Sequence, residues 1–223
     1  MTTFGGLKTA VARDLRDPGM STFDSTSIGD LINAALTEVG RIAPDRFCED
    51  ITVLPDTLSY QLRSTVFGLN VPEIEVRMVE VWDKTTTPHR FLGKLNSASA
   101  GLSRSSIDGW MAWNGVLSLT NALVDWLDPS LHVIRVWGYS PYPPLTSDSN
   151  TLTVSNELEQ AMRVYCRIEA LQRLLLERDL FSQWQSQSGN TDVTPASLMN
   201  GLSLAQADWR RRERQLFVPR EVA

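Results

Sequence analysis

The residue types that carry most enzyme and metal chemistry are few in this chain and lie far apart. His89 and His132 are the only histidines, and Cys48 and Cys166 are the only cysteines. None stands at the spacing of paired metal ligands. A Gly-x-Ser-x-Gly elbow is absent, and Gly5-Gly6 does not form a phosphate-binding loop. The sequence therefore predicts no enzyme, no cofactor and no metal site, and two free, buried thiols.

Tryptophan gathers in the middle of the chain. Exposed aromatic faces on a sheet could stack on nucleic-acid bases or on sugars. Packing inside the core or between subunits accounts for the same pattern, and we favour it. The tryptophans concerned are Trp82, Trp110, Trp113, Trp126 and Trp137.

A second cluster, near the C-terminal end, combines aromatic and basic residues. Trp and Arg dominate the hot spots of protein interfaces, although a basic helix face can also be merely solvated. The apolar run 216–219 favours a docking role, because chain ends are normally polar unless something binds them. We predict an anchor for a protein partner, with the contacts Trp209, Arg210, Arg211, Arg212, Arg214, Leu216 and Phe217.

Composition excludes several broad classes. The 223 residues are 42% hydrophobic and 21% charged, which is typical of a folded globular protein. The net charge of −5 argues against a chain held on nucleic acid by bulk electrostatics. No apolar run reaches the length of a membrane span, and no apolar stretch follows a basic start. We expect synthesis in the cytosol and no membrane partner.

Apolar spacings of three and four predict helices at both ends of the chain. A short helix is expected over about 3–16 and a second over 28–42. Ser155 is a good N-cap for a very long helix reaching 187, with Glu157 and Glu159 in its first turn. A last helix is predicted over about 196–215.

The middle of the chain predicts strands. Apolar residues alternate over 51–62 around Pro55-Asp56, which favours a strand pair, and β-branched runs follow at 74–82 and 131–137. Asn114-Gly115 between two apolar runs predicts a type I′ hairpin. Residues 95–107 read as an exposed loop, and the prolines of 139–145 are expected to end the sheet.

These elements predict an α+β fold: a helical bundle with an inserted small antiparallel β domain, either a sandwich or a barrel, and a C-terminal extension helix. The expected boundaries are 1–45 for the helical hairpin, 46–145 for the β domain, 146–190 for the long bundle helix and 191–223 for the C-terminal helix and anchor.

This order of parts resembles the head-to-tail adaptor family of tailed bacteriophages, also called connector or head-completion proteins. The resemblance rests on the helix over 28–42, the β insert from Phe47 to Trp137, the proline-rich exit and the long helix opened by Asn156-Glu157-Leu158-Glu159-Gln160-Ala161. It covers most of the chain.

The resemblance implies a structural virion protein at the neck, assembled in the cytoplasm of the host bacterium. Such a protein forms a ring, usually of twelve copies, that binds the portal protein, extends the DNA channel, helps to retain the genome and docks tail proteins (nozzle or terminator). Genomic DNA passes through without sequence-specific binding. In this view residues 195–218 dock on the portal, and the β loops face the tail, with Ser103, Arg104, Asn114 and Gly115 as candidates.

Other functions stay open at this point. A tail terminator or tail nozzle component is the nearest alternative, although such proteins are expected to be mostly β. A DNA-binding regulator would use the two N-terminal helices as a helix-turn-helix, but their connection is longer than the usual turn. An enzyme and a carbohydrate-binding protein are further alternatives.

Overall fold

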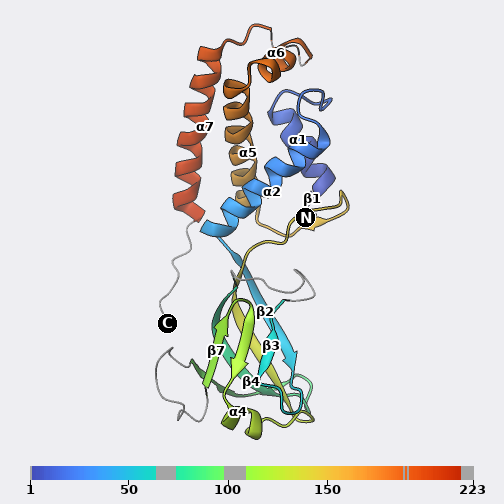
Figure 1. The fold of residues 1–223 in the computed structure, drawn as a ribbon, viewed down its shortest axis with the longest axis vertical. Helices are drawn as coiled ribbons and strands as arrows, with labels where there is room; N and C mark the ends of the chain where they lie inside the picture. Colours follow the sequence, from blue (N-terminus) through green and yellow to red (C-terminus); the bar gives the residue numbers. More distant parts are fainter. Residues whose placement is uncertain (1, 64–73, 98–108, 188, 190, 217–223) are drawn as a thin grey trace. The chain divides into compact units, whose positions relative to one another are not determined.

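The computed structural model describes residues 2–63, 74–97, 109–187, 189 and 191–216 (Figure 1). The chain forms two compact units. The helical unit takes its residues from the chain up to Ala43 and again from Pro144 onward, and the β unit is Pro44–Pro143. The predicted α+β class, a helical bundle with an inserted β domain and a C-terminal helix, is confirmed.

The helical unit begins with two capped helices. A two-residue strand, β1 (Thr2–Thr3), leads into α1 (Phe4–Asp14), and the Thr3 side chain accepts a hydrogen bond from the Gly6 N–H. Helix α2 (Ser25–Ile42) is capped by Asp24, which accepts from the Ser27 N–H at 2.7 Å. Both caps satisfy amide groups that a helix start leaves without intrahelical partners.

The partner of these helices arrives only after the β unit. Helix α5 (Asn156–Leu176) starts at the predicted cap Ser155 and packs against α2, so segments more than a hundred residues apart lie side by side (Figure 1). The returning chain is fixed to α2 because the Asn33 side chain bonds both the Leu145 carbonyl and the Leu145 N–H. Strand β10 (Thr151–Leu152) pairs with β1.

The predicted continuous helix over 155–187 is wrong, because the chain turns at Glu177. This residue is extended (φ −111°, ψ 98°), and a separate helix, α6 (Arg178–Gln187), follows. The turn buries Trp184, whose indole N–H donates to the Leu15 carbonyl at 3.0 Å. The apolar spacing over 155–187 by itself favours one helix. Packing of the Trp184 indole against the end of α1 overrides this local preference.

Helix α7 (Pro195–Leu216) matches the last predicted helix and packs along α5. Pro195 stands at the first helical position, where its missing N–H costs nothing. Thr194 and Ser197 bond each other's backbone N–H reciprocally, at 2.9 and 3.3 Å, as in a capping box.

Among the described residues, the β unit forms a pair of four-stranded sheets. One has the order β2-β9-β4-β5 and the other β3-β8-β7-β6, and all of the strand pairs are antiparallel except β6 with β7. The strands are β2 (Asp45–Thr52), β3 (Ser59–Gln61), β4 (Glu75–Asp83), β5 (Arg90–Lys94), β6 (Asn96–Ser97), β7 (Gly109–Trp113), β8 (Val116–Leu119) and β9 (His132–Ser140).

Side chains of both sheets share one core. It includes Val79 and Ile134 from the first sheet and Leu117 from the second, all at 0% exposure, together with Leu123 of the short helix α4 (Asn121–Trp126). A common core between two sheets is the arrangement of a β-sandwich.

Two strand predictions need correction. The segments on either side of Pro55-Asp56 are strands, but they do not pair: β2 pairs with β9 and β3 with β8. The sheet also continues through Ser140, one residue before the first proline of the exit. Local alternation identifies a strand but cannot choose its neighbour when two sheets are packed together.

Asp17 organises the connection between α1 and α2. It is 1% exposed, and its carboxylate accepts hydrogen bonds from the backbone N–H groups of Ser21, Thr22 and Phe23 and from the Ser21 hydroxyl, at 2.8–3.0 Å. Burial raises the pKa of Asp17, but these bonds outweigh it and hold the pKa below its usual value.

Replacing this carboxylate should destabilise the protein in a pH-dependent way. Because the folded-state pKa is lowered, the stabilisation is present above the usual Asp pKa and is lost as pH falls through the folded-state value. We expect Asp17→Asn to cost about 2 kcal/mol near neutral pH, as is usual for hydrogen bonds to a charged group, and less in acid. Urea unfolding at several pH values measures this. Asp24→Asn is the control, because Asn caps a helix as well as Asp; an equal loss in both variants would contradict the role of Asp17.

Candidate functional site

The structure divides the predicted C-terminal anchor into an inner and an outer set. On the inner side, Trp209 lies edge-on to Tyr165 of α5, with ring centroids 5.1 Å apart. Arg212 is half-buried and bonds Gln160 of α5 at 3.1 Å and Asp208 at 3.1 Å. Trp209 and Arg212 therefore hold α7 on α5. Leu216 is half-buried, and Phe217 lies outside the described residues.

The outer set forms one face of α7, which we call the α7 surface. Its residues are exposed and recur at helical spacing: Met199, Ser203, Leu204, Ala207, Arg210, Arg211 and Arg214. The first half is small or apolar, with Leu204 at 73% exposure, and the second half is basic. Arg211 bonds Asp208 at 2.6 Å, and Arg214 Nε bonds the Arg210 carbonyl. An apolar stripe next to arginines has the composition of a protein interface.

The predicted hairpin of the β unit is present. Strands β7 and β8 pair with Trp113 opposite Val116, and the turn residues Asn114 and Gly115 have φ of 51° and 74°, as a type I′ turn requires. Trp113, next to the turn, is 80% exposed. Ser103 and Arg104, the other predicted tail-facing residues, lie outside the described residues.

The tryptophans of the β unit differ in burial, so packing inside the core accounts for only some of them, and packing between subunits stays a prediction for the others. Trp110 is a core residue at 7% exposure, and its indole N–H donates to the Leu95 carbonyl. Trp137 and Trp126 are 38% and 53% exposed, with Trp126 stacked on His132, and Trp82 is half-buried. Most of these side chains therefore stand at the surface.

Trp82 and Trp137 belong to a network on the sheet that contains β2, β9, β4 and β5. Both indole N–H groups donate to the same oxygen of Glu80, at 2.9 and 3.0 Å. The Arg135 guanidinium lies 4.3 Å from the Trp82 ring centroid and makes a two-pronged ion pair with Asp50, at 2.6 and 2.7 Å. This pair lowers the pKa of Asp50 and raises that of Arg135. Every charged group in this network has a partner.

Sequence reasoning named the tryptophans of this network but missed its charged members. Glu80 and Trp82 are two apart on β4, and Arg135 and Trp137 are two apart on β9, so each pair faces the same side of its strand. That spacing was visible in the sequence. The pairing of Asp50 with Arg135 was not, because it depends on the register of β2 against β9.

The remaining candidates for chemistry are the other acidic groups, histidines and cysteines of the described residues. No group of His, Cys, Asp or Glu among them could hold a metal ion, and none of their helices is long and apolar enough to cross a membrane. His132 Nδ1 accepts from the Asp128 N–H. Cys166 is fully buried, and burial raises its pKa to about 12. Cys48 is exposed, so the prediction that both thiols are buried is wrong for this residue.

The N-terminal helices offer little that DNA would bind. Leu15 to Asp24 separate α1 from α2, which is longer than a helix-turn-helix turn. The solvent side of α2 carries Asp30 and Glu38, and its one arginine, Arg41, already pairs with Glu38 at 2.7 Å. This geometry does not favour the DNA-binding alternative.

Neither a protein-family model nor a curated protein matches the chain. Function is therefore inferred from the architecture and from these surfaces.

A matched pair of variants tests whether the tryptophans divide into buried residues that stabilise the fold and exposed residues that do not. Trp110→Ala removes a buried ring and should lower the free energy of unfolding by about 3–5 kcal/mol. Trp113→Ala, at an exposed position of the same strand, should change it by no more than about 0.5 kcal/mol. Denaturant unfolding measures both. A large loss for Trp113→Ala would show that this side chain supports the fold and is not available to a partner.

Proposed function

We propose that this chain is a structural virion protein, a head-to-tail adaptor of a tailed phage. It forms a ring under the portal, extends the DNA channel, helps to retain the packaged genome and docks the tail. The observation that carries the proposal is the split bundle: α1 and α2 precede the β unit, and α5, which follows it, packs on α2. That is the arrangement implied by the family resemblance of the sequence.

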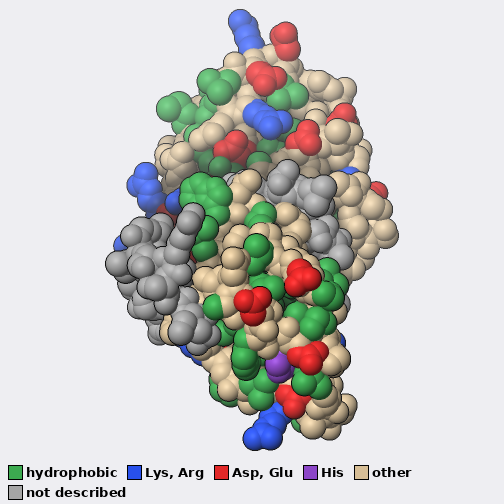
Figure 2. All heavy atoms as spheres, turned by 60° about the horizontal axis from the view of Figure 1, so that its bottom comes forward, with side chains coloured by type: hydrophobic (Ala, Val, Ile, Leu, Met, Phe, Trp, Pro, Cys, Tyr) green, Lys and Arg blue, Asp and Glu red, His purple; other side chains and the backbone are tan. Residues whose placement is uncertain are grey.

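The negative net charge of the chain supports the proposal that DNA passes through the ring without being bound by it. The net charge of −5 would be repeated in every copy of a ring, and an acidic wall does not retain passing phosphates. Figure 2 shows acidic side chains scattered among hydrophobic ones on the exposed face of the β unit. The described residues that this view draws do not form a continuous basic surface such as a DNA-binding groove would need.

The α7 surface is the part that we assign to the portal. Its exposed residues are free of the packing that holds Trp209 and Arg212 on α5, so they can contact a partner without unfolding the bundle. The contacts are therefore Arg210, Arg211 and Arg214 with the apolar Leu204. The β hairpin at Asn114 and Gly115, with Trp113, is the corresponding candidate for the tail.

Native mass spectrometry of the chain, alone and with the portal ring of its parent phage, tests the proposal. The expected result is a discrete complex with one copy of this chain per portal subunit. Point variants serve better than a truncation, because removal of α7 would uncover the face of α5 that it covers.

Reversing the charges of Arg210, Arg211 and Arg214 to Glu should abolish the complex without unfolding the chain. The control variant reverses three other exposed arginines, Arg13, Arg46 and Arg90, and changes the net charge equally. Loss of binding in both variants would mean that binding to the portal depends on the overall charge of the chain and not on the α7 surface. A chain that stays monomeric with the portal but binds tail proteins would move the assignment to another neck or tail component.

A further inference from the structure

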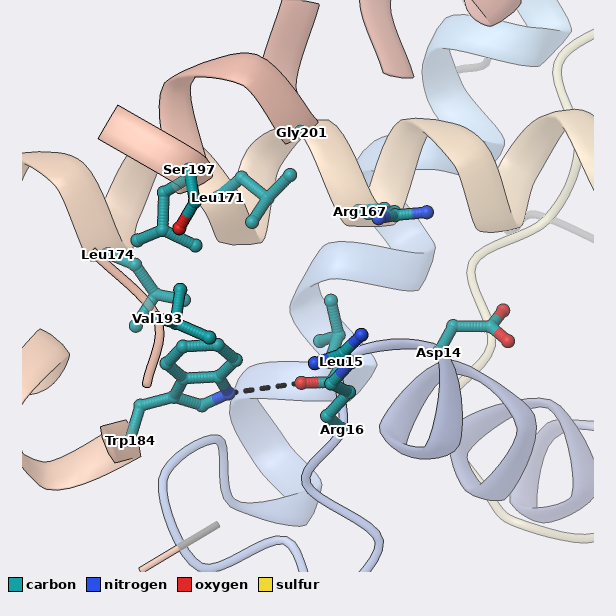
Figure 3. A pocket seen from close by; sticks show the side chains of 11 residues that line it. Asp14, Leu15, Arg16, Arg167, Leu171, Leu174, Trp184, Val193, Ser197 and Gly201 are labelled. Atoms are coloured by element: carbon teal, nitrogen blue, oxygen red, sulfur yellow. Dashed lines mark hydrogen bonds between the residues drawn. The ribbon is translucent and has the colours of Figure 1, made fainter. Parts of the chain in front are cut away.

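The helical unit contains a cavity of about 210 Å³ near the end of α1, bordered by α5, α6 and α7 (Figure 3). Its lining is largely apolar and mostly buried: Leu15, Leu171, Leu174, Trp184, Val193 and Leu198. Gly201 of α7 also borders it, and a Cβ at this position would meet only Leu171, at 3.9 Å. The missing side chain therefore contributes to the open space.

The floor of this cavity is held in place by hydrogen bonds. The Trp184 indole donates to the Leu15 carbonyl, as Figure 3 shows, and the Gln185 side chain donates to the Val193 carbonyl at 2.6 Å. Leu174 and Leu198 also line a second cavity of about 410 Å³. The two hollows share this part of their lining, so they adjoin at the corner formed by α5, α6 and α7.

Charged side chains stand on one side of the cavity, opposite Trp184 and Leu174 (Figure 3). Asp14 is already neutralised, because Arg163 binds both of its oxygens at 2.7 Å. Arg16 and Arg167 are exposed, and Arg167 has no hydrogen-bond or ion-pair partner among the described residues. The opening is therefore positively charged, in a chain that is acidic overall.

The size of the cavity points to a single side chain. A cavity of roughly 150 Å³ is enough to bind benzene, so one of about 210 Å³ has room for a large apolar side chain. The apolar floor suits a ring or a branched aliphatic group, and the two arginines suit carboxylates beside it.

We propose that this cavity is a docking site for a short acidic peptide segment of a partner protein, which inserts one large apolar side chain between α5, α6 and α7. Asp or Glu residues on either side of that side chain bind Arg16 and Arg167. The inference goes beyond the adaptor proposal and does not depend on it, because the peptide can bind or fail to bind whatever the portal does.

Amide NMR tests the docking site directly. The probe is the peptide acetyl-Glu-Asp-Phe-Asp-Glu-amide, titrated to about 5 mM so that weak binding is detected. The reporter is the indole N–H signal of Trp184, assigned by its disappearance in Trp184→Phe. The expected result is a saturable shift of this signal. A peptide with Ser in place of Phe, and one with Lys in place of the acidic residues, should each leave it unchanged.

Two variants locate the binding. Gly201→Leu fills the cavity and should abolish the shift, whereas Gly201→Ala adds only a methyl group and should keep it. Arg167→Glu should raise the dissociation constant at least about tenfold, because it places like charges together. The other indole signals report that each variant remains folded.

Several results would overturn the proposal. One is an unmoved Trp184 signal at the highest peptide concentration, and another is equal binding of the Ser or Lys peptide. Undiminished binding to Gly201→Leu would place the peptide elsewhere. A shift of the Trp184 signal in a chain shortened after Leu216, with no peptide added, would make the chain's own last residues the occupant in place of a partner.

Discussion

The structure depends on a contact that the chain can make only after it has completed the β unit. Helices α1 and α2 carry apolar faces that stay uncovered until α5 packs on them. The Asn33 amide, bound to both backbone groups of Leu145, fixes where the returning chain lies on α2. Pairing of β1 with β10 and the ion pair of Lys8 with Asp148 reinforce the same closure. Burial of apolar surface is the main favourable term in folding. The stability of the helical unit therefore depends on this closure.

Charged groups in both units are used mainly to orient other groups. Glu80 holds two indoles, Asp17 holds the backbone of a connection, and Arg212 holds α7 to α5. Other exposed arginines lie on the α7 surface and beside the cavity. Binding is best sought where exposed arginines adjoin apolar side chains, as they do at both of these places.

Much of this fold could be predicted from sequence because local rules govern it. The cap of α5, the Asn114-Gly115 hairpin and the α+β class follow from residue types and periodicity. The break at Glu177 could not be predicted, since it depends on where Trp184 meets Leu15, and neither could the pairing of β2 with β9. For the candidate site, the sequence located the basic helix but could not separate Trp209 and Arg212, which pack inward, from the exposed arginines. Burial depends on a neighbouring helix that local patterns do not specify.

The β unit enters and leaves the chain at neighbouring points. Asp45, next to its start, pairs with Ser140 near its end, so the ends of the insertion lie side by side in one pair of strands. For the helical unit, the whole β sandwich therefore satisfies the same geometric requirement as a short loop between α2 and α5. An insertion attached in this way can change in size or surface without moving the two chain ends that the bundle holds.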